Sequence, residues 1–173
     1  MKLYTAYGNR GKSLEHLVDR VNIQYKIKGI ADIRKVPTPT KVFKYERGRI
    51  RDGVFEKGEW VDYVGVAQGR AVAFDAKETR ETTRFELDNV HDHQVEFLKS
   101  WHDQGAKAFL LVCFVKRDHE IYVLEYKDFV KWWEGSKNGG RKSIPYDWFV
   151  ANCFRAKPES GILLHYLRGV LNV

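Results

Sequence analysis

The segment from Val61 to Thr79 constrains the fold most strongly, because its pattern is typical of two β-strands joined by a tight turn. If Gln68 and Gly69 are the two loop residues of a hairpin, Ala67 pairs with Arg70 and the register of both strands follows. The pattern therefore predicts an antiparallel pair of strands whose side-chain neighbours can be named before any other part of the sheet is placed.

This register places two carboxylates opposite each other. Asp62 lies across from Asp75, and Lys77 shares their face because side chains alternate along a strand. Opposed carboxylates repel, since their Cβ atoms would lie only ~4.5–5.5 Å apart. A divalent metal ion held by two carboxylates, with a lysine beside it, is an arrangement that cleaves phosphodiesters. The alternative is a surface Asp75–Lys77 ion pair and a solvated Asp62, which leaves unexplained why both acids stand inside apolar strands.

Two more polar residues are candidates for the same site. Gln94 interrupts the apolar stripe of a helix expected over residues 90–104, and a buried amide needs hydrogen-bond partners. It is either an ordinary satisfied core glutamine, or its carbonyl oxygen faces the metal site or its amide holds the attacking water. Glu15 flanks the apolar stripe of a helix expected over residues 13–28. It can supply a further carboxylate, or it is a first-turn acid that favours the helix N-terminus.

Two other motifs suggest chemistry that we do not favour. His91 and His93 are two residues apart, so in a helix they point to different sides and cannot readily share a metal ion. We expect a helix entry there, with Asp92 in its first turn. The Gly11-Lys12-Ser13 sequence is similar to the end of a phosphate-binding loop, but Ala6 stands where the first glycine is needed. An ATPase is therefore only a minor alternative.

The remaining periodicity predicts a single α/β domain with a mixed sheet. The continuous apolar run from Ala108 to Val115 suits a strand that is buried on both faces. Further strands are expected at residues 30–36 and 121–124, and a third helix at residues 126–134. The order is helix, strands, helix, strand, strand, helix.

Charge indicates the kind of partner. The chain carries a net charge of +7, which favours an anionic partner, most often nucleic acid. The stretch from Arg34 to Lys57 concentrates the surplus, with eight basic and three acidic residues. Residues 41–59 alternate aromatic, aliphatic and basic positions, with turn signals at Gly48, Asp52-Gly53 and Gly58. We interpret them as an exposed, protruding β-like arm, with a floppy basic loop as the alternative.

The sequence also bears on the compartment. No run of ~20 apolar residues and no N-terminal signal pattern is present, so we expect no membrane span and no secretion. Cys113 and Cys153 are the only cysteines, and their separation suggests neither a disulfide framework nor a zinc site. We therefore expect a cytoplasmic protein.

Six short stretches together resemble the RecU-type Holliday junction resolvases, a branch of the restriction-endonuclease-like superfamily. Their joint order and spacing, over nearly the whole chain, is what carries the resemblance. They are Asn9-Arg10-Gly11, Pro37-Thr38-Pro39, Asp62-Tyr63-Val64-Gly65, Phe74-Asp75-Ala76-Lys77-Glu78-Thr79, His91-Asp92-His93-Gln94 and Gly140-Arg141-Lys142-Ser143-Ile144.

The resemblance implies a restriction-endonuclease-like mixed sheet flanked by helices, in a single nuclease domain over residues 1–173 with a protruding basic stalk at about residues 37–60. It implies a homodimer that binds four-way junction DNA, makes paired symmetric nicks and uses Mg²⁺, for which Mn²⁺ can substitute. A recombinase is a further possible partner. By position, Asp62, Asp75 and Gln94 match the metal-site side chains and Lys77 the catalytic lysine. The residues expected to bind DNA are basic: Arg10, Lys35, Lys41, Lys44, Arg47, Arg49, Arg51, Arg141 and Lys142.

The chain departs from the family pattern in three places. Asp75 stands where the family commonly has glutamate, and Trp60 stands where a metal-site threonine is usual. The long polar N-terminal extension of many relatives is absent from this sequence. Because tryptophan cannot ligate a metal, a junction-binding protein without cleavage activity is the main alternative function, and an ordinary duplex endonuclease is a weaker one.

Overall fold

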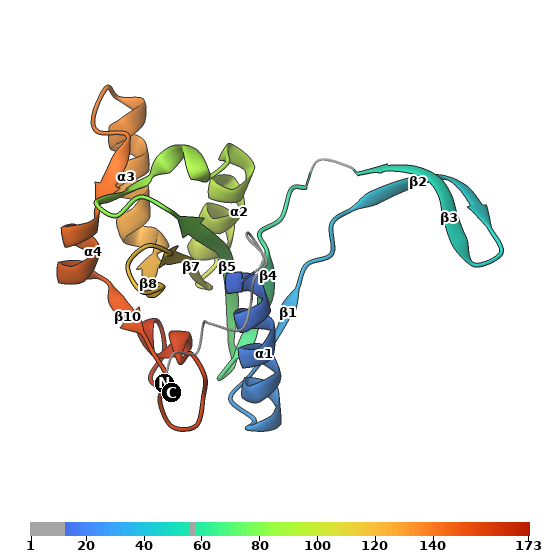
Figure 1. Ribbon diagram of the computed structural model, residues 1–173, viewed down its shortest axis with the longest axis horizontal. Coiled ribbons are helices and arrows are strands. Elements are labelled where there is room, and N and C mark those ends of the chain that lie inside the picture. The colour runs from blue at the N-terminus through green and yellow to red at the C-terminus, as the bar shows by residue number, and fades with distance from the viewer. Residues whose placement is uncertain (1–12, 56–57) are drawn as a thin grey trace.

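A six-stranded mixed sheet organises the part of the chain that the computed structural model describes, residues 13–55 and 58–173 (Figure 1). Its order is β1-β4-β5-β7-β8-β10. The central pair β5 and β7 is parallel, and the four other neighbouring pairs are antiparallel. The predicted mixed sheet is thus confirmed. The strands are β1 (Ala31–Lys35), β4 (Tyr63–Ala67), β5 (Arg70–Thr79), β7 (Lys107–Phe114), β8 (Glu120–Glu125) and β10 (Phe154–Ala156).

Helices cover both faces of this sheet. The first, α1 (Ser13–Ile27), packs on one face, while α2 (Asp92–Asp103), α3 (Tyr126–Lys137) and α4 (Tyr146–Asn152) line the other. The three predicted helices are confirmed to within a few residues at their ends. The sequence analysis missed α4 and a small second sheet of β6 (Arg84–Glu86) and β9 (Ser143–Pro145). Short 3-10 turns occur at η1 (Leu87–Asn89) and η2 (Tyr166–Gly169).

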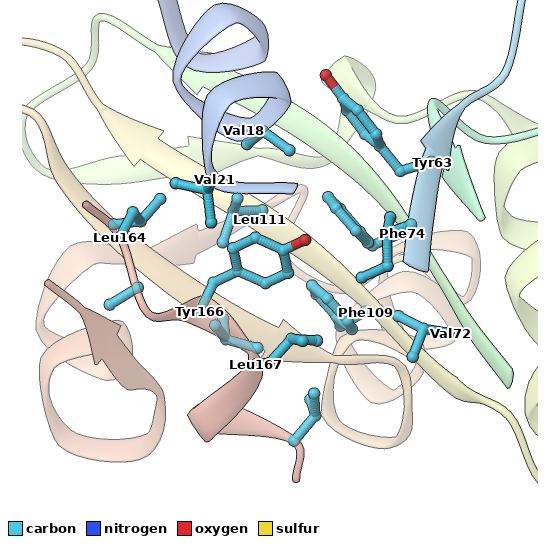
Figure 2. Packing of buried hydrophobic residues seen from close by; sticks show 14 of the residues in the cluster. Val18, Val21, Tyr63, Val72, Phe74, Phe109, Leu111, Leu164, Tyr166 and Leu167 are labelled. Atoms are coloured by element: carbon cyan, nitrogen blue, oxygen red, sulfur yellow. The ribbon is translucent and has the colours of Figure 1, made fainter. Parts of the chain in front are cut away.

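The core under α1 is built around three stacked aromatic rings (Figure 2). Phe74 lies between Tyr63, at a ring-centroid distance of 4.9 Å, and Phe109, at 4.7 Å. Tyr166 from the C-terminal segment packs against Phe74 from a third side. Alternate residues of β7 fill a second core beneath α2 and α3, so both faces of β7 are apolar, as the run at residues 108–115 predicts.

The predicted hairpin register is confirmed. Ala67 pairs with Arg70, and Tyr63 pairs with Phe74 at the other end of the ladder. Gln68 and Gly69 both have positive φ angles, 49° and 74°, as a two-residue type I′ turn requires. The next rung beyond Tyr63 is therefore Asp62 opposite Asp75.

Gly65 allows β1 and β4 to approach each other, and its replacement provides a first prediction. A Cβ at this position would lie 2.3 Å from the Asp32 carbonyl oxygen and 2.5 Å from the Ile33 Cα. We expect Gly65→Ala to destabilise the protein by about 1–3 kcal/mol or more, because backbone rather than a flexible side chain must move. Thermal unfolding should show a Tm lowered by several degrees.

Gly135→Ala is the matched control for this prediction. A Cβ at Gly135 meets nothing within 4 Å, and alanine favours a helix such as α3. Its Tm should be equal to or above that of the wild type. Equal Tm values for the two variants would show that the β1–β4 approach is not tight.

A two-stranded hairpin projects away from the main sheet (Figure 1). It consists of β2 (Thr40–Glu46) and β3 (Arg49–Phe55), and every residue in both strands is exposed. This confirms the predicted arm, and we call residues 37–60 the stalk. Its turn is Arg47-Gly48, as Gly48 predicts. The predicted turn at Asp52-Gly53 is wrong: both residues lie inside β3, where the ladder shifts register near Lys44.

The structure also describes the two cysteines and the length of the helices. Cys113 is buried and Cys153 is half-buried, and both are free thiols. Among the helices of the described ranges, none has the length and apolar character needed to cross a membrane.

Candidate active site

Asp62 and Asp75 link the two strands of the hairpin by reciprocal side-chain-to-backbone hydrogen bonds at the point where the ladder ends. The Asp62 backbone N–H donates to Asp75 Oδ1 at 3.0 Å. In return, the Ala76 N–H donates to Asp62 Oδ2 at 2.9 Å. Asp75 is fully buried, whereas Asp62 is partly accessible. Each carboxylate therefore uses one oxygen to bind the opposite backbone and keeps one oxygen for other partners.

Lys77 brings a positive charge to this pair. Its Nζ lies 2.6 Å from Asp75 Oδ2 and its side chain is only 14% exposed. The contact is an ion pair by distance, but its angles do not make a hydrogen bond, so Asp75 Oδ2 has no hydrogen-bond donor among the residues described. Lys77 Nζ instead donates to Gln94 Oε1 at 3.0 Å. The lysine is thus held between the acid pair and α2.

Gln94 is buried and its carbonyl oxygen has two partners. Besides Lys77, it accepts the His91 backbone N–H at 3.0 Å, which completes a capping box at the start of α2. The residue is therefore both a satisfied core amide and a neighbour of the acid pair. These two hydrogen bonds fit the interpretation of Gln94 as a satisfied core amide. Its role as a metal ligand or as the residue that holds the attacking water stays a prediction.

Burial and the neighbouring charge disfavour a second negative charge at the pair. The pKa of Asp62 is raised to about 7. Burial is the largest cause, followed by the negative charge of Asp75, and a hydrogen bond between the two carboxyls acts in the same direction. The Ala76 N–H and the Lys77 charge lower this pKa only in part. At neutral pH, a second cation would therefore be bound favourably at this site.

The donor set fits a hard divalent cation. Two carboxylates, each with one oxygen that is not bonded to the backbone, match the ligands of Mg²⁺, which is commonly bound by one or two carboxylates and keeps several waters. Asp75 Oδ2 is paired with Lys77 Nζ but accepts no hydrogen bond, so such an ion would share this oxygen with the lysine. In the described part of the chain, no group of three or more histidine, cysteine or acidic residues is placed to hold a metal ion, so Asp62 and Asp75 would be the only two side chains of these types at this site.

Glu15 and Lys35 lie together at the α1 side of the sheet. Lys35 Nζ is 2.5 Å from Glu15 Oε2, and this hydrogen bond is the main cause of the raised pKa of Lys35, to which Asp62 also contributes electrostatically. Lys35 is thus in contact with Glu15 and close enough to Asp62 to interact with its charge. The role of Glu15 as a further active-site acid stays a prediction, and so does the role of Lys35 in binding DNA.

The expected separation of two histidines is wrong. The rings of His91 and His93 stack with their centroids 5.6 Å apart. The reason is that His91 is the N-cap of α2 with an extended backbone, so helical spacing does not apply to it. The predicted helix entry, with Asp92 in the first turn, is confirmed.

The residues expected to bind DNA are spread over separate surfaces. Arg10 lies outside the described residues. Arg141 and Lys142 are exposed in the loop before β9, where the Lys142 carbonyl accepts the Leu87 N–H. The stalk carries the others apart from Lys35, all exposed: Lys41, Lys44, Arg47, Arg49 and Arg51.

The sequence analysis placed Trp60 next to the site but did not foresee its contact with α2. Trp60 contacts Phe97 of α2, with ring centroids 5.2 Å apart. Phe97 follows Gln94 by three residues and so lies on the same side of α2. The helical spacing was visible in the sequence, but a contact between the end of the stalk and α2 depends on how the helix docks on the sheet.

The fold and the site define a class of protein. A mixed sheet that presents two carboxylates and a lysine on neighbouring strands, beside a protruding basic hairpin, is the arrangement of a metal-dependent nuclease.

Comparison with known proteins narrows this class. The model of the family described as RecU, Recombination protein U, matches residues 9–172. A Holliday junction resolvase RecU from Pediococcus pentosaceus is 37% identical over 169 residues, which cover 95% of this chain and 84% of that protein. A Levilactobacillus brevis protein of the same name is 36% identical over 171 residues, 96% of this chain and 85% of its own. The chain belongs to the RecU family.

A solved structure is also similar. It is that of Archaeoglobus fulgidus Hjc, a Holliday junction resolvase, with 10% sequence identity and a TM-score of 0.48 over 82% of this chain and 94% of that one.

Proposed function

We propose that the protein is a structure-selective endodeoxyribonuclease that resolves Holliday junctions by paired symmetric nicks in DNA recombination and repair. The observation that carries this proposal is the hydrogen-bonded arrangement of Asp62 and Asp75 on neighbouring strands, with Lys77 beside it. Family membership over residues 9–172 supports the substrate class. Residues 1–173 then form a single nuclease domain, and the stalk is an insertion in it at about residues 37–60.

The chemistry is metal-assisted phosphodiester hydrolysis. Asp62 and Asp75 would hold Mg²⁺, and Mn²⁺ can take its place because both ions prefer oxygen ligands. Gln94 would become a third oxygen donor only by giving up one of the two hydrogen bonds that its Oε1 accepts. When bound, such an ion polarises a phosphoryl oxygen and lowers the pKa of a bound water. Lys77 orients the attacking water and stabilises the negative charge that develops on the phosphate. Gln94 positions Lys77, because its Oε1 accepts a hydrogen bond from Nζ.

Junction DNA is bound through phosphates and shape. The stalk cations, with Arg10, Lys35, Arg141 and Lys142, contact the backbone and produce a steep salt dependence. Selectivity for the four-way junction comes from the stalk and from the geometry of a homodimer, which places two active sites symmetrically on the DNA. The protein acts in the cytoplasm, and a recombinase is a possible partner.

A nicking assay tests this function. We expect wild-type protein with Mg²⁺ to nick a labelled four-way junction at paired symmetric positions, and to leave a linear duplex of the same arm sequence largely intact. EDTA should abolish the nicks. Lys77→Ala should lower the nicking rate by about 10²–10³-fold, as expected for loss of one preorganised donor in an active site.

Lys99→Ala is the matched control, because Lys99 is an exposed lysine on α2 that is paired with Asp103. It should nick like the wild type. Tight junction binding without nicks under any divalent metal would instead favour a non-catalytic junction-binding protein, the alternative suggested by Trp60. Preference for the linear duplex would indicate an ordinary endonuclease.

A further inference from the structure

A row of three aromatic side chains lies beside the proposed catalytic residues. Trp60 contacts Phe97 at 5.2 Å between ring centroids, and Phe97 stacks on Trp101 at 5.1 Å. Phe97 and Trp101 are half-buried against the core beneath α2. Trp60, at the end of the row, is 51% exposed and is the most exposed of the five tryptophans.

The row belongs to the active site by position. Trp60 precedes Asp62 by two residues in the segment that enters β4. Phe97 lies on the same side of α2 as Gln94, whose Oε1 accepts the hydrogen bond from Lys77. Trp60 is therefore close in sequence to one acid of the pair, and Phe97 lies on the helix whose Gln94 binds the lysine.

The sheet surface next to this row is also apolar. Val64 and Val66 alternate with inward-facing residues of β4, so they share the face of Asp62. Val64 is half-buried against the same core as Phe97, and Val66 is 53% exposed. An apolar surface thus begins at the acid pair, in a protein whose proposed substrate is otherwise bound by cations.

Phosphate binding does not explain an exposed indole at this place. An indole ring offers a π-face, and the part of DNA that matches it is a nucleobase, for which stacking on an aromatic side chain is sequence-tolerant. Bases inside a linear duplex are stacked on both sides. Bases at a branch point can be unpaired or unstacked at a lower free-energy cost.

We propose that Trp60, supported by Phe97 and Trp101, stacks on an unstacked nucleobase next to the scissile phosphate, and so positions the strand and favours branched over linear DNA. This inference rests on the proposed nuclease function. Trp60 is a positioning and specificity-determining residue in this scheme. It takes no part in the bond cleavage, which the acid pair and Lys77 carry out.

The proposal is tested by a double-mutant cycle that combines substitutions of Trp60 with removal of single bases from the DNA. Trp60→Leu removes the π-face, whereas Trp60→Phe keeps a smaller one. Each variant is assayed in single-turnover nicking with intact junctions and with junctions that carry an abasic site at each nucleotide flanking the cut in turn. We expect Trp60→Leu to nick the intact junction about 5–150-fold more slowly, the range that loss of one stacked base implies.

The abasic substrates separate stacking from packing. At one abasic position, wild type and Trp60→Leu should nick equally slowly, and Trp60→Phe should stay close to the wild type on the intact junction. A Trp60→Leu defect of the same size on every abasic junction would overturn the proposal, because Trp60 would then act by packing the stalk against α2. Full activity of Trp60→Leu on the intact junction would overturn it too. Trp148→Leu, at a half-buried tryptophan of α4, is the control.

The same cycle is measured as junction affinity in the Asp62→Asn background, where cleavage is not needed. If the effects of Trp60 and one base on affinity are coupled but the wild type does not nick, Trp60 stacks on that base and the protein is not a nuclease. If the wild type nicks normally with metal but no coupling is found, the protein is a nuclease and Trp60 does not stack on a base. The two proposals can therefore fail independently.

Discussion

Asp62→Asn is expected to lower the rate of junction nicking by at least ~10³-fold while junction affinity stays close to that of the wild type. The loss is large because one of the two carboxylates that would hold the metal ion loses its charge, and the ion's share of the catalysis is several kcal/mol, with each 1.36 kcal/mol worth tenfold. Affinity should persist because the cations of the stalk are exposed on a hairpin that projects away from the main sheet (Figure 1).

The same substitution should stabilise the metal-free protein. The pKa of Asp62 is raised to about 7, so between about pH 4 and 7 the folded state binds more protons than the unfolded state. Stability contributed by the protonated form is present at low pH and is lost as pH rises to 7. Asparagine does not titrate. At pH 8 in EDTA we expect Asp62→Asn to be more stable by on the order of 2 kcal/mol, or about 4–8 °C in Tm.

Thermal unfolding at pH 5 and pH 8 checks this prediction. The advantage of Asp62→Asn should shrink at pH 5, where wild-type Asp62 holds its proton, and added Mg²⁺ at pH 8 should raise the Tm of the wild type only. Asp32→Asn is the control, because Arg34 and Lys26 lower the pKa of Asp32. That variant should gain no stability at pH 8. An Asp62→Asn protein that is less stable than wild type at pH 8 would contradict the raised pKa of Asp62.

Removal of the stalk is expected to separate junction recognition from folding. Replacing residues 38–58 by about four glycine and serine residues keeps Trp60 and the buried Val61. Since every residue of β2 and β3 is exposed, the Tm should change little. Junction affinity should fall by roughly 10²-fold or more at physiological salt, because five cations that would contact phosphates are lost.

Salt titration of junction binding measures this effect. The slope of log affinity against log salt should become shallower by up to ~0.9 for each phosphate contact that is lost. A second variant keeps the hairpin and replaces its five basic residues by glutamine, which separates charge from shape. If the deletion variant still binds the junction tightly and prefers it to a linear duplex as the wild type does, the stalk has no part in recognition.

Local patterns accounted for most of the elements and for the register of the key hairpin. A two-residue turn with a side-chain period of two leaves one way to pair the strands, so Asp62 opposite Asp75 could be derived from the residues alone. The continuous apolar run of β7 indicated a strand buried on both faces for a similar reason. The small β6–β9 sheet was missed because its strands have three residues each and lie far apart in sequence.

The sequence by itself determined the acid pair, the lysine on the same face, the basic arm and the family. Only the tertiary structure decided what surrounds them: the docking of α2, which brings Gln94 to Lys77 and Phe97 to Trp60, and the ion pair of Glu15 with Lys35. The physical reason is that strand pairing and alternation act between residues whose spacing is set by the backbone. Contacts between a helix and a sheet depend on the packing of the whole core, which no short stretch of sequence encodes.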